Sequence, residues 1–199
     1  DDALNLGSIG VTGASSANAV AEEADLIIAL GTRLQDFTTG SWALFKGPNR
    51  RILSINVAAY DARKHDAISV VGDAKVTLAE LSNALGEHQA RSVDPALKIS
   101  WIEAVDGVTA LPTGNALPTD AQVIGAVQRS TDDDAIVVCA AGGLPGELHK
   151  LWKAAKPNGY HVEYGFSCMG YEIAGGLGVK MARPDREVVV MVGDGSYMM

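Results

Sequence analysis

The chain alternates short apolar runs with longer stretches whose apolar residues recur at helical spacing. In the first 90 residues, three apolar runs predict strands, at 25–30, 51–57 and 68–71. Helical patterns at 15–23 and 74–85 complete this part, and Ser15 or Ser16 is expected to cap the earlier helix. Strands that alternate with helices of this length indicate a parallel sheet.

A second set of elements begins at Pro118-Thr119-Asp120, a good helix start. Its predicted helices lie at 120–130, 146–155 and 171–182, and its predicted strands at 135–139 and 187–192. The residues between the two sets carry mixed charge, three prolines and one expected helix near 98–105. We therefore expect an α/β fold in two domains, residues 1–86 and 118–199, joined by a linker at 87–117. A long surface excursion within one domain is the alternative.

The two strands of the second part each run into a glycine-rich loop. One is followed by Ala141-Gly142-Gly143-Leu144 and the other by Gly193-Asp194-Gly195-Ser196. Glycines allow tight turns in which backbone N–H groups converge on an anion such as phosphate, and Asp194 offers a hard oxygen ligand for magnesium. Either loop alone is ordinary turn chemistry. If their strands are neighbours, both loops lie at the carboxyl edge of one sheet, where open α/β folds bind ligands.

The segment Glu163–Tyr171 combines glycines with aromatic, sulfur and apolar side chains. Such a mixture suits a flat, partly apolar ligand whose edge is recognised by backbone groups. A hydrophobic turn packed in the core is the other interpretation. Elsewhere the four histidines show no metal-ligand spacing, and no Ser/His/Asp, P-loop or zinc motif is present.

Composition narrows the classes of function. The chain has 199 residues, 47% of them hydrophobic and 20% charged, as in an ordinary globular protein. Its net charge of −8 argues against a nucleic-acid or acidic-membrane partner. With no signal peptide, no long apolar stretch and only Cys139 and Cys168, it is expected to be cytoplasmic and reduced. Because it opens without an initiator methionine and stops just after Ser196, we expect a fragment of a longer protein.

Several segments, in order along the chain, carry a family resemblance. They are IGVTGASSAN at 9–18, ADLIIALGTRLQDFTTG at 24–40, VVGDAK at 70–75, the segment Glu163–Tyr171, and ARPDREVVVMVGDGS at 182–196. Together they resemble the thiamine-diphosphate enzymes of the acetolactate synthase group. The resemblance implies a Rossmann-like central domain at 1–86, followed by the first part of a thiamine-diphosphate-binding α/β domain at 118–199. It also implies that the pyrimidine-binding domain, with the catalytic glutamate, lies outside this chain.

The resemblance assigns site residues as well. Asp194 is expected to ligate Mg²⁺. The cofactor-binding positions are Gly193, Asp194, Gly195 and Ser196 on one side of the diphosphate, Gly142, Gly143 and Leu144 on the other, and Ser167 and Met169 at the aminopyrimidine. The Met169 side chain would wedge beneath the cofactor and hold its two rings in a V shape. No catalytic residue is expected within the chain itself.

The function implied is that of a homodimeric or homotetrameric enzyme with thiamine diphosphate and Mg²⁺, acting on a small molecule. It would hydrolyse a carbon–carbon bond and so open the ring of a cyclic 1,2-dione in myo-inositol catabolism. A 2-oxo-acid decarboxylase or carboligase, including one for malonic semialdehyde, shares every site residue. A non-enzymatic nucleotide-binding module shares only the scaffold. The fragment alone is expected to be inactive, to bind cofactor weakly and to expose apolar surface.

FAD, which acetolactate synthases bind in the central domain, is not expected here. The chain has Asn56-Val57-Ala58 and Val11-Thr12 where the resemblance leads us to expect an acidic residue and a bulkier polar pair. Arg33 and Asp73 remain, so a vestigial nucleotide site is conceivable.

Overall fold

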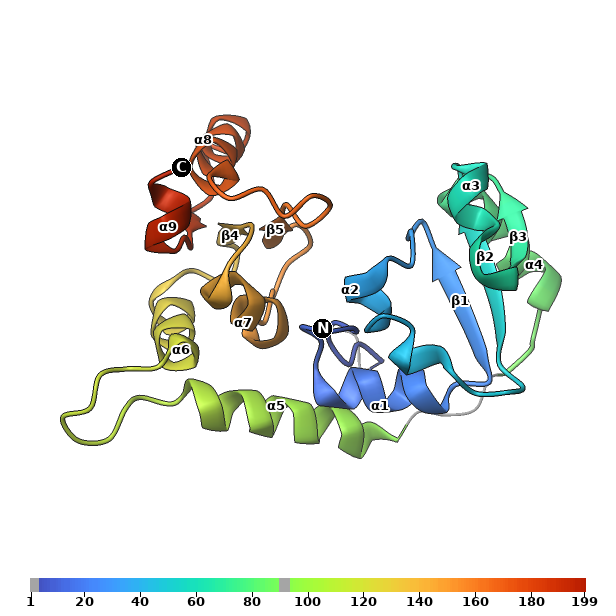
Figure 1. Cartoon of the computed structure of the whole chain (residues 1–199), viewed down its shortest axis with the longest axis horizontal. Helices are drawn as coiled ribbons and strands as arrows, with labels where there is room; N and C mark the ends of the chain where they lie inside the picture. The colour runs from blue at the N-terminus through green and yellow to red at the C-terminus, as the bar shows by residue number, and fades with distance from the viewer. Residues whose placement is uncertain (1–3, 90–93) are drawn as a thin grey trace. The chain divides into compact units, whose positions relative to one another are not determined.

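The computed structural model describes residues 4–89 and 94–199, which form two compact units (Figure 1). One unit covers Leu6–Lys98, and the other is built mainly from Ile99–Met199. Each contains its own three-stranded parallel sheet, which confirms the predicted α/β class. The boundaries of a linker at 87–117 stay a prediction. Of the helices in the described residues, none has the length and apolar character that crossing a membrane requires.

The first unit contains all the strands and helices predicted for it, each within one residue of the predicted bounds. The described elements are α1 (Ser15–Glu23), β1 (Leu26–Leu30), α2 (Asp36–Thr39), η1 (Ala43–Phe45), β2 (Arg51–Asn56), α3 (Ala59–Ala62), η2 (Lys64–Asp66), β3 (Ile68–Val71) and α4 (Ala74–Leu85). The sheet order is β1-β2-β3, with Ile28 opposite Leu53 and Leu53 opposite Ile68. Parallel strands joined by helices are the arrangement that the alternating pattern indicates.

Capping differs from the prediction at one helix of this unit. The Asp73 carboxylate accepts a hydrogen bond from the Val76 N–H at 3.0 Å and so caps α4. At α1, by contrast, the N-cap is Ala14, which has no capping side chain. Neither Ser15 nor Ser16 therefore caps α1, and the Ser16 hydroxyl donates instead to a carbonyl of the preceding loop.

The second unit is built around a parallel sheet with the order β5-β4-β6. Its elements are α5 (Pro95–Thr109), which leads into the unit, then α6 (Asp120–Ser130), β4 (Ile136–Cys139), α7 (Gly143–Leu151), β5 (Tyr160–Val162), α8 (Tyr171–Ala182), β6 (Val188–Val190) and α9 (Asp194–Tyr197). The sequence pattern does not predict β5, because this strand is only three residues long and has the polar His161 at its centre.

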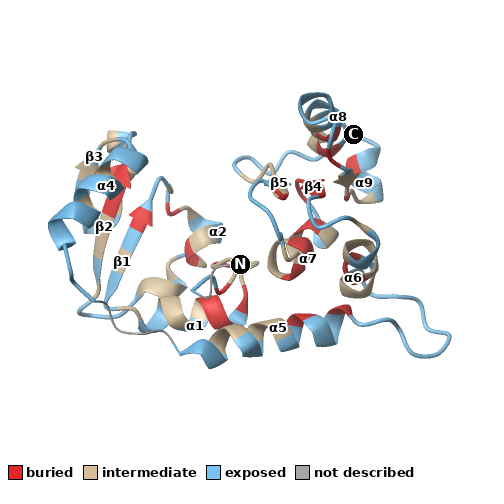
Figure 2. Ribbon diagram, turned by 180° about the vertical axis from the view of Figure 1, so that it is seen from behind, coloured by how far each residue is buried: buried red, intermediate tan, exposed pale blue. Residues whose placement is uncertain are grey.

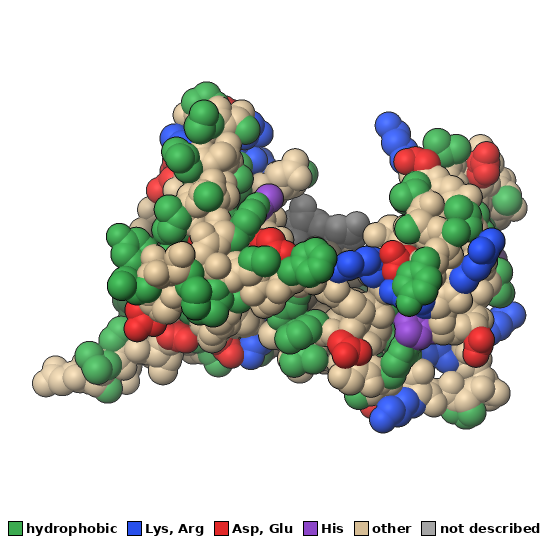
Figure 3. Space-filling view, turned by 45° about the horizontal axis from the view of Figure 1, so that its top comes forward, with side chains coloured by type: hydrophobic (Ala, Val, Ile, Leu, Met, Phe, Trp, Pro, Cys, Tyr) green, Lys and Arg blue, Asp and Glu red, His purple; other side chains and the backbone are tan. Residues whose placement is uncertain are grey.

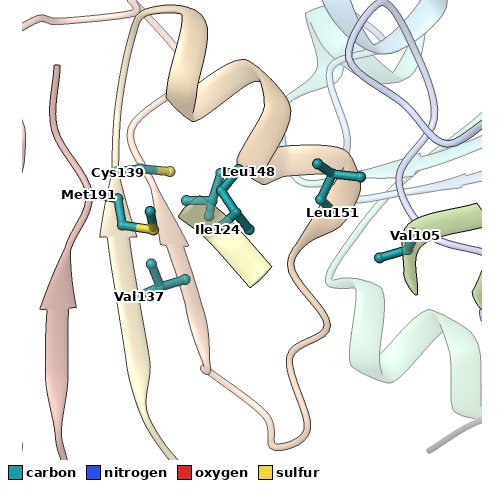
Figure 4. Packing of buried hydrophobic residues seen from close by; sticks show 7 residues of the cluster. All are labelled: Val105, Ile124, Val137, Cys139, Leu148, Leu151 and Met191. Carbon is teal, nitrogen blue, oxygen red and sulfur yellow. The ribbon is translucent and has the colours of Figure 1, made fainter. Parts of the chain in front are cut away.

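Helices cover both faces of this sheet. Val137 and Cys139 of β4 pack with Ile124 of α6 in the buried cluster of the unit (Figure 4). On the other face, Gly176 brings α8 so close to β6 that any β-carbon there would collide with Val190. Every residue of β4 is buried, so this strand lies at the centre of the core (Figure 2).

The segment that leads to α6 contributes to the same core. Helix α5 is longer than the helix expected near 98–105, and its Val105, only 3% exposed, belongs to the buried cluster (Figure 4). Thr119 and Gln122 form a reciprocal capping box at the start of α6. This capping box confirms the helix start predicted at Pro118-Thr119-Asp120.

Candidate functional site

Three segments meet at the carboxyl edge of the second sheet. Strands β4, β5 and β6 are parallel, and β4 pairs with both of the others. Hydrogen bonds continue past the strand ends, from the Met191 N–H to the Val138 carbonyl (3.0 Å) and from the Glu163 N–H to the Cys139 carbonyl (3.2 Å). The segments between these strands and the helices that follow them are 140–142, 163–170 and 191–193. The two glycine-rich loops thus follow neighbouring strands, which was the condition for both to lie at one edge of the sheet. The segment after β5 lies at the same edge.

Gly142 is the N-cap residue of α7 and has a backbone conformation that is almost exclusive to glycine. Its φ is 121° and its ψ is −179°. Helix α7 starts three residues earlier than predicted, so Gly143 and Leu144 form its first turn and do not lie in a loop. Exposed N–H groups at the start of a helix favour an anion. A negative charge already lies nearby, because Asp120 Oδ2 is 4.0 Å from a β-carbon built on Gly143.

Glu163 shapes the segment that follows β5. Its carboxylate accepts hydrogen bonds from the N–H groups of Cys168 (2.7 Å) and Phe166 (3.1 Å), which hold the pKa of Glu163 below its usual value. Ser167 has a φ of 57°, a left-handed conformation that is uncommon for a residue with a side chain. Residues 165–169 are exposed. The segment is therefore a surface turn organised by hydrogen bonds, and the alternative of a turn packed in the core is wrong.

Met169 and Gly195 come together at this edge from the segments after β5 and β6. A β-carbon built on Gly195 would lie 3.4 Å from Met169 Cε. Met169 nevertheless remains 42% exposed, so part of its side chain is available to a ligand. Met169 and Gly195, which the family resemblance assigns to opposite ends of the cofactor site, therefore lie close together.

The segment around Asp194 is a helical turn, where the sequence predicted a tight glycine turn. Asp194 is the exposed first residue of α9, and Gly193 precedes it with a φ of −77°. Neither Gly193 nor Gly195 has a positive φ, so neither glycine is needed for its backbone conformation. At Gly195 an added β-carbon would be in ordinary van der Waals contact with Met169. One Asp194 oxygen accepts the Gly195 N–H at 2.8 Å.

Ser196 points inward, away from the exposed side of this turn. Its hydroxyl donates to the carboxylate of Glu172, a fully buried residue in the first turn of α8. The sequence pattern did not single out Glu172. An acidic residue near a helix N-terminus is ordinary helix chemistry, so the pattern alone gives no reason to single it out.

Burial keeps the side chains beneath the edge uncharged near neutral pH. The pKa of Cys139 is raised to about 11, chiefly by burial and further by the charge of Glu172. Burial also raises the pKa of Tyr160 and lowers that of His149. The three groups adjoin one another, with the Tyr160 oxygen 3.4 Å from Cys139 Sγ and 3.3 Å from His149 Nδ1.

The residues weighed for a flavin site in the first unit have structural partners. The Asn56 side chain donates to the Thr32 carbonyl at 3.1 Å and accepts from the Ala58 N–H at 2.9 Å, which ties together the loops after β1 and β2. Arg33 donates to the side chain of Gln35 at 3.0 Å. The absence of FAD stays a prediction.

A cation at Asp194 would need further ligands of another kind. Within residues 4–89 and 94–199, no three His, Cys, Asp or Glu side chains gather in a way that could hold a metal ion. A cavity of about 330 Å³ in the second unit is lined by Asn158 and Arg186 and lies near the start of β5, away from the carboxyl edge. Another, of about 410 Å³, is lined by Trp42 and Arg51 in the first unit.

Three bacterial enzymes are similar to the chain over 98% of its length. It is 44% identical to the 3D-(3,5/4)-trihydroxycyclohexane-1,2-dione hydrolase of Geobacillus thermodenitrificans, 42% identical to that of Clostridium perfringens and 45% identical to that of Bacillus cereus. The chain spans about a third of the length of these relatives, 34%, 35% and 34% respectively.

Two family models match the two parts of the chain. Residues 1–81 match the central domain of thiamine pyrophosphate enzymes, and residues 140–199 match their C-terminal thiamine-pyrophosphate-binding domain. The second match covers the three segments at the carboxyl edge of the β5-β4-β6 sheet. The chain therefore belongs to the thiamine pyrophosphate enzymes, with a match to their central domain in its first unit and to their C-terminal thiamine-pyrophosphate-binding domain in its second.

Proposed function

We propose that the protein containing this sequence is a thiamine-diphosphate-dependent hydrolase that opens the ring of a trihydroxycyclohexane-1,2-dione. The single observation that carries the proposal is the convergence of three family segments at one sheet edge, in a chain 42–45% identical to hydrolases of that name. The reaction would cleave the carbon–carbon bond between the two carbonyl carbons with addition of water. A role in myo-inositol catabolism is part of the proposal and rests on the resemblance described above.

The residues at the edge suit the proposed cofactor. Gly142 and Gly143 present the exposed start of α7 to one side of the diphosphate, together with Leu144. Gly193 and the backbone N–H groups of Gly195 and Ser196 would contribute on the other side, and the Ser196 side chain would not. When bound, thiamine diphosphate supplies a nucleophilic carbon and an electron sink for cleavage next to a carbonyl.

Ser167 and Met169 suit the aminopyrimidine end of the cofactor. Both lie in an exposed turn whose backbone is fixed by Glu163, so the Ser167 carbonyl and the Met169 N–H could pair with the ring edge. The Met169 side chain is partly exposed beside Gly195, where a wedge between the two ends of the cofactor would have to be. By holding the two ends of the cofactor in a fixed relation, Met169 would keep the groups that exchange a proton close together.

Mg²⁺ is part of the proposal through Asp194. Its carboxylate is exposed, begins a helix and lies at the same edge as Gly142. A hard cation held by this carboxylate would supply positive charge that offsets the charge of the diphosphate. The remaining ligands would come from the diphosphate, water and backbone oxygens.

A homo-oligomeric assembly is proposed from the apolar surface of the second unit. Exposed hydrophobic side chains are numerous on the molecular surface (Figure 3), and in α8 they include Ile173, Leu177 and Met181 at successive helical turns. A contiguous exposed stripe of this kind marks an interaction surface more often than a solvated face. We expect a second copy of the protein to cover it.

The test of the hydrolase proposal is turnover of competing substrates by the full-length protein that contains this sequence. Hydrolysis of the cyclic dione to an open-chain acid, dependent on thiamine diphosphate and Mg²⁺, is the expected result. Decarboxylation of pyruvate or malonic semialdehyde with no activity on the dione would replace the hydrolase with the decarboxylase or carboligase alternative. Binding of ADP or FAD without any turnover would favour the nucleotide-binding module.

A further inference from the structure

Glu172 is a fully buried carboxylate that joins two of the three segments at the sheet edge. It accepts hydrogen bonds from the Ser196 hydroxyl, at 2.8 Å to Oε1 and 2.7 Å to Oε2. It also accepts one from the Gly170 N–H, at 3.0 Å to Oε2. The Gly170 N–H lies 2.8 Å from the Ser196 oxygen as well, so the three groups form a closed set of contacts.

Burying a carboxylate is costly unless hydrogen bonds or a cation compensate it. Among the ion pairs found in the described residues, none includes Glu172. Its position in the first turn of α8 helps, since a helix N-terminus favours negative charge. Two explanations are open for a carboxylate that is buried at such a cost. Either its hydrogen bonds hold neighbouring segments in a required geometry, or an apolar residue could replace it.

The geometry that Glu172 enforces concerns Met169 and Asp194. Gly170 directly follows Met169, and Ser196 lies two residues after Asp194 within α9. The backbone is closely packed between the two segments, because a β-carbon on Gly170 would come within 3.1 Å of Met199 Cβ and 3.7 Å of the Ser196 carbonyl oxygen. A fixed contact between Gly170 and Ser196 therefore sets how far Met169 lies from Asp194.

We propose that Glu172 is a positioning residue, which acts through Ser196 and Gly170 to hold Met169 and Asp194 at the spacing that the cofactor requires. This inference rests on the proposed function, since it gives Met169 and Asp194 their roles toward thiamine diphosphate. Glu172 itself does not touch the cofactor. Without the Glu172 carboxylate, the turn at 166–170 and the start of α9 lose their common hydrogen-bond acceptor. The distance between Met169 and Asp194 is then no longer fixed.

The test combines Glu172→Gln, which keeps the shape of the side chain and removes its charge, with Ser196→Ala, which removes the hydroxyl donor. Glu187→Gln is the matched control, because Glu187 lies before β6 at the opposite edge and accepts the Asp132 N–H. For each full-length variant, the dissociation constant of thiamine diphosphate at saturating Mg²⁺ is measured by calorimetry. The melting temperature without cofactor and the amide hydrogen exchange of residues 166–170 are measured in parallel.

We expect Glu172→Gln to weaken cofactor binding at least fivefold and to speed exchange at 166–170, while the control changes neither. Ser196→Ala should act in the same direction, and the double variant should lose no more than the stronger single variant, because both break the same contact. If Glu172→Gln does not fold, Ser196→Ala alone decides the matter by the same readouts. Unchanged cofactor affinity with a lowered melting temperature would reduce Glu172 to a stabilising residue and overturn the proposal. Failure of the unmodified protein to bind thiamine diphosphate would instead overturn the proposed function, and the positioning role with it.

Discussion

Met169 Cε lies within van der Waals reach of Gly195, because a β-carbon on the glycine would be 3.4 Å away from it. Gly195 has a backbone conformation open to any residue, so the glycine is not needed for its φ. The contact joins the segment after β5 to the segment after β6. It is the most direct structural reason to treat these two segments as one site.

Gly195→Ala should place a methyl group in contact with Met169, 3.4 Å from its Cε, and weaken thiamine-diphosphate binding severalfold by narrowing the space that the cofactor would share with both residues. The fold should not suffer, because Gly195 lies in a helical turn and the methionine end can move. Gly178→Ala is the control: it also lies in a helix, nothing lies within 4 Å of its added carbon, and the change should stabilise the protein by about 0.5–1 kcal/mol. Calorimetric affinity and urea unfolding of both variants check this. Equal cofactor affinity in the two variants would contradict the role of the contact.

Met169→Ala should lower the rate constant for turnover at saturating cofactor by at least tenfold. The reason is that a smaller side chain no longer holds the two cofactor rings in the V shape that the reaction needs. Met169→Leu, of similar volume, should keep most of the rate. Steady-state kinetics of the two variants with excess thiamine diphosphate measure this, and a fully active Met169→Ala variant would exclude Met169 as the wedge.

Asp194→Asn should weaken Mg²⁺-dependent binding of thiamine diphosphate at least tenfold, or about 1.4 kcal/mol. An amide is a poorer ligand than a carboxylate for a hard cation. Stability should change little, because Asp194 is exposed. Asp185→Asn, which alters an exposed carboxylate paired with Arg183, serves as the control. A titration of Mg²⁺ at fixed thiamine diphosphate decides the outcome, and identical midpoints for Asp194→Asn and wild type would remove Asp194 from the metal site.

A thiol reagent at pH 8 should label Cys168 and leave Cys139 unmodified in the folded protein. Cys168 is exposed in the turn at the sheet edge, whereas Cys139 is fully buried and its pKa is raised to about 11. With that pKa only about one Cys139 thiol in a thousand is ionised at pH 8, and the thiolate is the reactive form. Thiamine diphosphate with Mg²⁺ should slow labelling of Cys168, because the cofactor would cover Ser167 and Met169 beside it. Mass spectrometry of the labelled peptides reports both effects, and unprotected Cys168 would argue against the assigned site.

Stability should fall as the pH drops below about 6.5, in part because of His149. Burial lowers the pKa of His149 in the folded state beneath its ordinary 6.5, so the unfolded chain takes up the proton first. The contribution of His149 is therefore complete above pH 6.5 and is lost progressively as the pH falls toward the folded-state pKa. His149→Asn should flatten this part of the pH dependence. Urea unfolding at pH 5 and pH 7.5 tests the sign, and an equal pH dependence in variant and wild type would assign the loss to other groups.

The sequence pattern predicted the regular elements well and the contacts between them poorly. The strand at 68–71 and the helices at 74–85 and 171–182 have the predicted bounds, because local periodicity determines them. Helix α7 starts early because Pro145, which reads as a helix breaker, is tolerated in a first turn where no N–H bond is lost. Strand β5 depends on pairing with β4, which no local pattern reveals.

The candidate site divides in the same way. Its location at a sheet edge followed from two strands ending in glycine-rich loops, and the pairing of β4 with β6 confirms that part. The reason expected for Gly195 was wrong, since no positive φ is needed there. Glu172 could not be foreseen, because its importance lies in a contact with Ser196 from a different segment. The roles of the individual residues toward the cofactor stay predictions, which the binding measurements above test.

Calorimetric titration of the full-length protein with thiamine diphosphate, in the presence and absence of Mg²⁺, tests the central claim most directly. We expect one thiamine diphosphate to bind per chain. Its affinity should depend on Mg²⁺ and should be lower in the Asp194→Asn variant. Binding of ADP or FAD with no binding of thiamine diphosphate under either condition would contradict it.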